Sequence, residues 1–135
     1  MLVINIDGSC DCSSGEGSWS YILNGKSFSG REEDHTTNNR MELMAAIKAL
    51  ESVLDPCNIL VLSDSRYVVN GIMLYVKKWS ENGWINSQNK PVKNKDLWEN
   101  LIEKKKKHNQ VIFKWIRREE NSAADYAAKK ARGVK

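Results

Sequence analysis

The spacing of apolar residues predicts a chain in which strands and helices alternate. Apolar and polar residues alternate over residues 1–7, as in a strand with one covered face, and we expect this strand to end at the turn Asp7-Gly8-Ser9. Two further strands are predicted over residues 19–23 and 27–32. They are joined at Asn24-Gly25, a dipeptide typical of tight β-hairpins.

Residues 40–54 have the period of a helix with one wide apolar face. We expect Asn39 to cap this helix, and Glu42, three residues later, stands at the position of a capping-box acid. Glu42 is also in line with the apolar face, which would hold its carboxylate close to whatever that face covers. The helix is expected to stop before Pro56. Its two apolar rows are Leu43, Ile47, Leu50 and Leu54, and Ala46, Ala49 and Val53.

The second half of the chain continues the alternation. The apolar run of residues 58–62 is typical of a strand covered on both faces, and Ser65 is expected to cap the next helix. A helical crossover from the hairpin to this strand implies partly parallel pairing, so the pattern predicts an α/β fold with helices flanking a mixed sheet. The remaining predicted elements are a helix through Val68 and Ile72, a helix over residues 93–108, a strand over residues 111–116, and an alanine-rich helix over residues 121–131 capped by Ser122.

Composition limits the class of protein. With 135 residues, 41% of them hydrophobic, the chain suits one compact domain. Its longest apolar run, residues 59–62, is too short to span a membrane, and residues 1–6 lack the basic start of a secretory signal. The odd cysteine count, Cys10, Cys12 and Cys57, favours a reducing compartment. We therefore expect a cytoplasmic protein, and a monomer because no feature indicates a self-complementary surface.

The net charge of +4 and the pI of about 9.0 are mild, but the basic residues are unevenly distributed. Lysines and tryptophans are interleaved over residues 77–95, which we call the basic segment. Cationic groups beside flat aromatic rings suit the phosphates and bases of a nucleic acid. A solvated helical face with tryptophans in the core is the alternative. The candidate binding residues in this segment are Lys77, Lys78, Trp79 and Trp84.

Four carboxylates fall at the ends of predicted elements. Asp7 and Asp64 each end a strand, and they would meet at the carboxyl edge of the sheet if those strands were parallel neighbours. Glu42 lies in the covering helix, and Asp125 lies in the first turn of the last helix. Converging acids repel one another unless a cation offsets their charge, and oxygen ligands suit Mg²⁺ or Mn²⁺. The alternatives are local turns at the two strand ends and helix caps at the other two positions.

Several segments, in this order along the chain, resemble type I ribonuclease H. They are Ile6-Asp7-Gly8-Ser9-Cys10, Thr36-Thr37-Asn38-Asn39-Arg40-Met41-Glu42-Leu43-Met44-Ala45-Ala46, Ser63-Asp64-Ser65-Arg66-Tyr67-Val68, Gly83-Trp84, Lys90-Pro91-Val92-Lys93-Asn94-Lys95-Asp96-Leu97-Trp98, and residues 121–125 before the alanine-rich helix. The resemblance covers nearly the whole chain. It implies one domain over residues 1–135 with the ribonuclease H-like fold, a five-stranded mixed sheet flanked by helices.

The same resemblance implies an activity and a set of site residues. The activity is a metal-dependent endonuclease that hydrolyses the RNA strand of an RNA–DNA hybrid, leaving a 3′-hydroxyl and a 5′-phosphate. It implies two Mg²⁺ ions, with Mn²⁺ as a substitute, and Asp7 as the bridge between them. The catalytic and metal-binding residues implied are Asp7, Glu42, Asp64 and Asp125. The hybrid-binding residues implied are Thr37 in a phosphate pocket for the DNA strand, Asn38, Asn39, Lys77, Lys78, Trp79 and Trp84.

The chain departs from the family before the last helix, where members usually carry a glycine-rich loop with a histidine. Residues 117–121 are short and contain no histidine, and neither His35 nor His108 falls at the matching place. Glu119 or Glu120 could substitute in part, although a plain shortened turn is the simpler interpretation. We expect slower turnover or an altered metal preference rather than loss of activity.

Two other functions remain open from the sequence. A hybrid-binding protein with weak catalysis would fit the missing histidine, but a binder gains nothing from four acids beside phosphates. A DNA-acting nuclease of the same fold is the second alternative, and the Asn38-Asn39 pair and the basic segment argue against it. Cleavage preference among hybrid, duplex RNA and duplex DNA separates the three functions.

Overall fold

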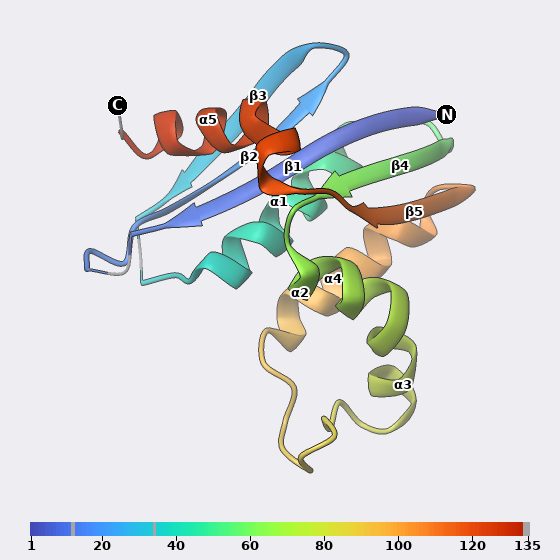
Figure 1. Ribbon diagram of the computed structural model, residues 1–135. Coiled ribbons are helices and arrows are strands. Elements are labelled where there is room, and N and C mark those ends of the chain that lie inside the picture. Colours follow the sequence, from blue (N-terminus) through green and yellow to red (C-terminus); the bar gives the residue numbers. More distant parts are fainter. Residues whose placement is uncertain (12, 34, 134–135) are drawn as a thin grey trace.

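The computed structural model describes residues 1–11, 13–33 and 35–133, and Cys12 lies outside the described residues. Its centre is a five-stranded sheet made of β1 (Leu2–Cys10), β2 (Gly17–Leu23), β3 (Lys26–Glu32), β4 (Asn58–Ser63) and β5 (Gln110–Trp115). The strand order is β3-β2-β1-β4-β5, with antiparallel pairing from β3 to β1 and parallel pairing from β1 to β5 (Figure 1). The predicted mixed sheet flanked by helices is confirmed.

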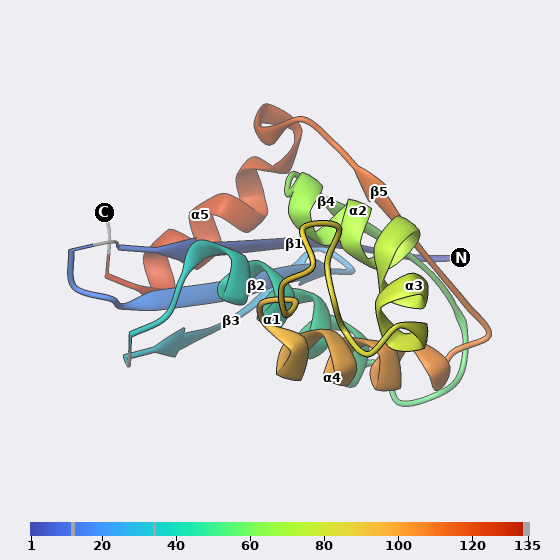
Figure 2. The ribbon, with the colours of Figure 1, turned by 90° about the horizontal axis from the view of Figure 1, so that it is seen from below.

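Helices cover both faces of this sheet. They are α1 (Asn38–Ser52), α2 (Arg66–Asn70), a π-helical turn (Gly71–Tyr75), α3 (Val76–Glu81), α4 (Lys95–Lys106), a 3₁₀ turn (Arg118–Asn121) and α5 (Ser122–Ala131). Helices α1 and α4 lie on one face of the sheet, and α5 lies on the other face (Figure 2). In the part of the chain that the structure describes, no helix combines the length and the apolar character needed to cross a bilayer.

Helix α1 is the main helical contribution to the core. Leu43, Ile47 and Leu50 are almost completely buried, and they belong to one apolar cluster with Ile4 and Ile6 of β1. Their spacing is the reason: residues three and four apart share one helix face, and alternate strand residues share one sheet face. The predicted apolar row continued past the end of the helix. Leu54 lies beyond Ser52 and is 92% exposed, so its predicted place in the apolar row is wrong.

The predicted hairpin is confirmed in its turn as well as in its strands. Asn24 and Gly25 both have positive φ angles, 54° and 75°, as a two-residue turn between twisted strands requires. Ser65 also caps α2 as predicted, since its hydroxyl accepts a hydrogen bond of 3.2 Å from the Val68 backbone N–H.

Two other predicted helix starts are wrong by one or two residues. Thr37, not Asn39, caps α1, and its Oγ1 accepts a hydrogen bond of 3.1 Å from the backbone N–H of Arg40. The residue before α5 is Asn121, so Ser122 is the first helical residue and not the cap. Asn121 makes no capping bond because its amide is used elsewhere, in the site described next.

Candidate active site

The two strand carboxylates are neighbours because their strands are parallel neighbours. The last parallel pair between β1 and β4 is Ile6 with Ser63, so Asp7 and Asp64 follow side by side where this pairing ends. The predicted end of the first strand is wrong, since β1 runs on to Cys10. Its antiparallel pairing with β2 continues for those residues and supplies the backbone hydrogen bonds that β4 no longer offers. Asp7 therefore lies inside a strand rather than in a turn.

Glu42 is brought to the same place by a close contact between α1 and β1. Gly8 follows Asp7, and a Cβ atom at Gly8 would overlap the backbone of Met41 and Glu42. The missing side chain lets the helix lie directly on the strand. The Gly8 N–H then donates a hydrogen bond to Oε1 of Glu42. Glu42 thus binds a strand amide, and the capping-box interpretation of this acid is wrong.

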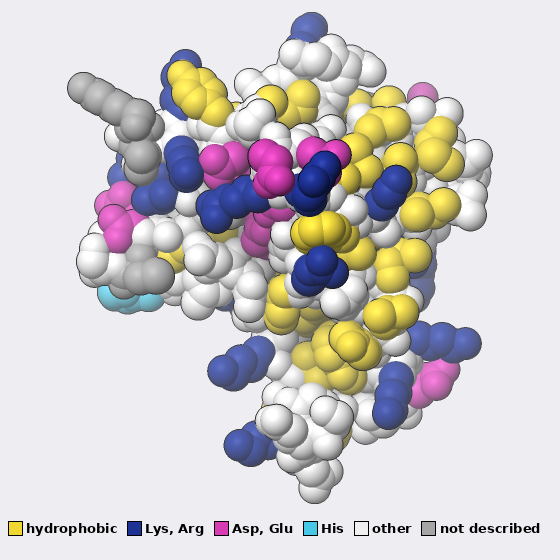
Figure 3. Space-filling view, in the orientation of Figure 1, with side chains coloured by type: hydrophobic (Ala, Val, Ile, Leu, Met, Phe, Trp, Pro, Cys, Tyr) yellow, Lys and Arg dark blue, Asp and Glu magenta, His cyan; other side chains and the backbone are white. Residues whose placement is uncertain are grey.

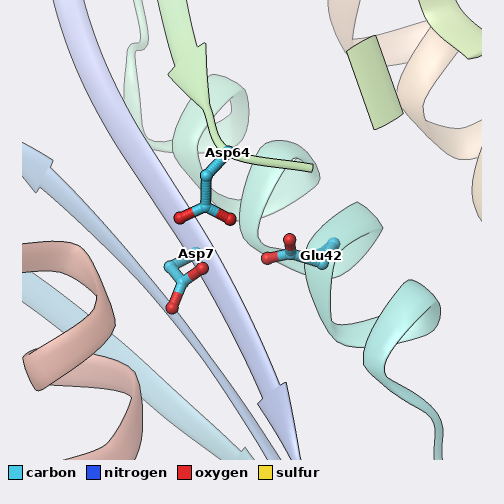
Figure 4. Close-up of side chains that lie close together, drawn as sticks. All are labelled: Asp7, Glu42 and Asp64. Carbon is cyan, nitrogen blue, oxygen red and sulfur yellow. The ribbon is translucent and has the colours of Figure 1, made fainter. Parts of the chain in front are cut away.

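The carboxylates of Asp7, Glu42 and Asp64 point towards one another (Figure 4), with one oxygen of each within 4.8 Å of the others. Asp7 is 4% exposed and Glu42 is 7% exposed. Burial, with the nearby charges of Asp64 and Asp125, raises the pKa of Asp7 from 3.8 to about 8. Burial and the charges of Asp7 and Asp64 also raise the pKa of Glu42 well above its ordinary value. A bound cation would offset this repulsion between neighbouring acids, so the cluster is a candidate cation site.

Asp125 approaches this group from α5. Its negative charge contributes to the raised pKa of Asp7, so Asp125 lies near that carboxyl group. Its oxygens also face two cations, at 3.2 Å from Nζ of Lys129 and 3.9 Å from Nη2 of Arg118. Asp7, Glu42 and Asp64 therefore form the cluster, and Asp125 lies near Asp7 at its edge.

One residue of the site was missed by the sequence analysis. The Asn121 side chain is 2% exposed, and its Nδ2 donates to the backbone oxygen of Ile6 at 2.7 Å and to Oδ2 of Asp64 at 3.1 Å. Its Oδ1 accepts a hydrogen bond of 3.1 Å from Asn5. Asn121 therefore ties the start of α5 to β1 and orients the Asp64 carboxylate. A buried amide at the start of a helix is easily mistaken for a cap, and no local sequence signal distinguishes the two uses.

Comparison with known proteins agrees with this geometry. The family model described as RNase H matches residues 1–132. The chain is 40% identical over 133 residues to ribonuclease H of Rickettsia bellii (strain RML369-C), covering 96% of this chain and 84% of that protein. It is 46% identical over 138 residues to ribonuclease H of Francisella philomiragia subsp. philomiragia, covering 96% of this chain and 90% of that protein.

The chain belongs to the ribonuclease H family. Among solved structures, LC9-RNase H1, described as a type 1 RNase H with the type 2 active-site motif, is similar with a TM-score of 0.77. It is 25% identical, and the match covers 98% of this chain and 72% of that chain. Family membership supports a metal-dependent ribonuclease H that hydrolyses the RNA strand of RNA–DNA hybrids.

In this member of the ribonuclease H family, a second hollow adjoins the acids. It is lined by Cys10, Thr36, Thr37, Asn38 and Asn39, at the start of α1. The two asparagines also line the hollow that contains Asp7, Glu42 and Asp64, so they connect the two. The Thr37 oxygen accepts the capping hydrogen bond, which leaves its hydroxyl hydrogen available for another acceptor.

The basic segment, made of most of α3 and the loop that follows it, stands away from the sheet (Figure 1). Lys77 and Lys78 are exposed on α3. Trp79 is half-buried and packs with Trp84 and Trp98 at ring-centre distances of 6.3 and 5.7 Å. Trp84 is 9% exposed, so its ring supports Trp79 and offers almost no face of its own. The two lysines are thus exposed to solvent, and the tryptophan rings pack against one another.

Proposed function

We propose that Asp7, Glu42, Asp64 and Asp125 bind two Mg²⁺ ions and that the chain uses this centre to cut the RNA strand of an RNA–DNA hybrid. The observation that carries the proposal is the mutual approach of three carboxylates, within 4.8 Å, from β1, α1 and β4. Buried acids that lie so close together are stable in their charged form only beside a cation.

The donor set fits this metal. All four candidates are carboxylates, and hard oxygen ligands suit Mg²⁺ or Mn²⁺ better than softer metals. When bound, two such ions would activate a water molecule and stabilise the leaving oxygen of the phosphodiester. Their charge would also offset the repulsion that raises the pKa values of Asp7 and Glu42.

The remaining residues of the site would position the acids and the substrate. Asn121 holds the Asp64 carboxylate by a hydrogen bond of 3.1 Å, which fixes the direction of its second oxygen. We propose that Thr37 binds a phosphate of the DNA strand and that Asn38 and Asn39 contact the hybrid between this phosphate and the acids. Their position along the two adjoining hollows supports this assignment.

The basic segment is proposed as the second contact with the hybrid. Lys77 and Lys78 are exposed and would neutralise backbone phosphates, while Trp79 and Trp84 hold α3 and its loop in place.

Basic side chains also lie around the acids of the site. Lys and Arg side chains lie next to the Asp and Glu side chains near the centre of the face in Figure 3. The chemical difference between the two strands is the 2′-hydroxyl, which the site must use to select RNA.

The test is cleavage of a labelled RNA–DNA hybrid, with duplex RNA and duplex DNA as controls. We would compare wild type and Asp7→Asn in Mg²⁺, in Mn²⁺ and in chelator. Cutting of the hybrid alone, dependent on metal and lost in the variant, is the expected result. Tight hybrid binding without cutting in either metal would refute the proposal and favour a hybrid-binding protein, and cutting of duplex DNA would favour a DNA-acting nuclease.

A further inference from the structure

The short turn before α5 has its own internal ion pairs. Arg117 Nε lies 3.1 Å from Oε1 of Glu120, and the same oxygen accepts a hydrogen bond of 3.1 Å from the Arg117 backbone N–H. These bonds hold the pKa of Glu120 below its usual range, so its carboxyl group stays ionised near neutral pH. Glu119 lies 3.9 Å from the same guanidinium. Both glutamates therefore face Arg117, and neither of them lines the hollow of the acids.

Arg118 is different from its neighbours in this turn. It lines the hollow together with Asp7, Glu42 and Asp64. Its side chain is 73% exposed, and its one ion pair among the described residues is the long contact of 3.9 Å between Nη2 and Asp125. A guanidinium has five N–H donors in a rigid fork, so most of the donors of Arg118 remain available.

We propose that Arg118 is a phosphate-binding residue of the active site, which donates hydrogen bonds to the non-bridging oxygens of the phosphodiester to be cut. The inference rests on the proposed function and assigns a residue to it. Arg118 is an exposed cation at the edge of a cluster of acids, and among the described residues it has no close ion pair of its own. The anion that this site must accept is a phosphodiester. Arginine matches phosphate oxygens with two parallel N–H donors.

The chemistry that Arg118 can supply is limited to charge and hydrogen bonding. A guanidinium cannot be deprotonated in a protein, so it cannot carry a proton to the leaving oxygen or from the attacking water. Arg118 therefore stabilises negative charge on the phosphate, and it does so in the part of the fold where members of the family usually carry a histidine-bearing loop.

A purely local role for Arg118, as the partner of Asp125, is the competing explanation. Lys129 lies closer to Asp125, at 3.2 Å from Oδ2, one turn along α5. Asp125 thus has a nearer cation that does not line the hollow. If the role of Arg118 were to hold Asp125, loss of Lys129 would be at least as damaging.

The experiment is single-turnover cleavage of an RNA–DNA hybrid by wild type, Arg118→Ala, Arg118→Lys, Lys129→Gln and Arg117→Ala. For an exposed group that stabilises phosphate charge, we expect Arg118→Ala to lower the rate by about ten- to a hundredfold, below the loss seen for buried oxyanion donors. Arg118→Lys should recover part of the rate, Lys129→Gln should lose less than Arg118→Ala, and Arg117→Ala, outside the hollow, should match wild type.

Two further readouts separate phosphate binding from other roles. Hybrid binding in chelator, where the substrate stays uncut, should lose salt dependence in Arg118→Ala, with the slope falling by about 1. The shape of the pH–rate profile and the Mg²⁺ concentration for half-maximal rate should stay as in wild type. An unchanged rate and salt slope in Arg118→Ala would overturn the inference, and so would full rescue by added Mg²⁺, which indicates a role through Asp125. A wild type that does not cut hybrid would instead refute the proposed function.

Discussion

Gly8 and Glu42 join the central strand to the helix that covers it. The Gly8 N–H donates to the Glu42 carboxylate, and a Cβ atom at Gly8 would overlap the backbone of α1 at Met41 and Glu42. The position of one acid of the site thus depends on a neighbouring residue that has no side chain. Because Asp7 precedes Gly8, the same contact also sets the distance between two of the carboxylates.

Gly8→Ala should therefore affect both stability and activity. The atoms in the way are backbone atoms, which cannot rotate aside, so α1 must shift away from β1. We expect a loss of about 1–3 kcal/mol in the free energy of unfolding, the usual cost of overpacking, measured by urea denaturation. The rate of hybrid cleavage should fall by more than the loss of folded protein accounts for, because Glu42 moves with the helix.

The matched control for this substitution is Gly25→Asn in the hairpin turn. Gly25 has open space around its Cβ position and a φ of 75°, a conformation that asparagine tolerates. Gly25→Asn should leave hybrid cleavage unchanged. Equal stability and equal cleavage for Gly8→Ala and wild type would show that the strand and helix are not held together in this way.

Asn121→Ala tests the buried amide that orients Asp64. Its loss leaves the Ile6 carbonyl and one Asp64 oxygen without a donor, which should cost about 1–3 kcal/mol of unfolding free energy. Loss of an orienting partner typically weakens a metal site by about 10–100-fold, so the Mg²⁺ requirement for cleavage should rise. Asn5→Ala is the control, because it removes the Asn121 contact that does not involve Asp64. An unchanged Mg²⁺ requirement in Asn121→Ala would contradict the orienting role.

The metal-free protein should lose stability as the pH rises. The pKa of Asp7 is raised from 3.8 to about 8 by burial and by the charges of Asp64 and Asp125. The folded protein therefore holds a proton that the unfolded chain releases above about pH 4. The resulting stabilisation is complete below the unfolded-state pKa and is lost as the pH rises through the folded-state value.

The measurement is thermal unfolding in chelator at pH 5 and pH 8. We expect a lower Tm at pH 8 for wild type and a smaller difference for Asp7→Asn, which has no acid to titrate there. Added Mg²⁺ should raise the Tm more at pH 8 than at pH 5, because metal binding requires deprotonated carboxylates. A wild-type Tm that rises from pH 5 to pH 8 in chelator, by the same amount as in Asp7→Asn, would contradict the raised pKa.

Lys78→Ala tests the basic segment. Lys78 is exposed on α3 and has no ion pair among those found in the described residues. If it contacts a phosphate, hybrid binding should weaken and the slope of log K against log salt should fall by about 1. Lys26→Ala, at the start of β3 and far along the chain from this segment, should leave the slope unchanged. Identical slopes for both variants and wild type would exclude a phosphate contact at Lys78.

Local patterns were sufficient for most of the fold, and the family resemblance was needed to select the four acids. Alternation identified the first strand, a continuous apolar run identified β4, helical spacing identified α1, and Asn24-Gly25 identified the hairpin. Each of these signals depends on residues close together in the chain. The convergence of Asp7 and Asp64 also followed from a general rule, since the carboxyl ends of parallel neighbouring strands lie at one edge of a sheet. The prediction needed only the strand order, which the structure confirms.

The errors came where distant segments compete for the same group. Asn121 was predicted only as the first residue of the last helix, but its side chain makes hydrogen bonds with Asn5, Ile6 and Asp64. Glu42 looked like a capping-box acid, but the Gly8 amide of β1 binds it instead. In both cases a tertiary partner replaces the local one, and the sequence near the residue carries no sign of that exchange.

The sequence by itself determined most of the strands and helices, because periodicity is a property of local chain segments. It indicated the four carboxylates through their places in the segments that resemble type I ribonuclease H. Only the tertiary structure decided which neighbouring residues hold those acids and which basic side chain lines their hollow. Gly8 and Asn121 act through close packing and hydrogen bonds between segments separated by tens of residues, and Arg118 lines a hollow formed with β1, α1 and β4. Such contacts depend on distances of a few tenths of an ångström, and no pattern along the chain encodes those distances.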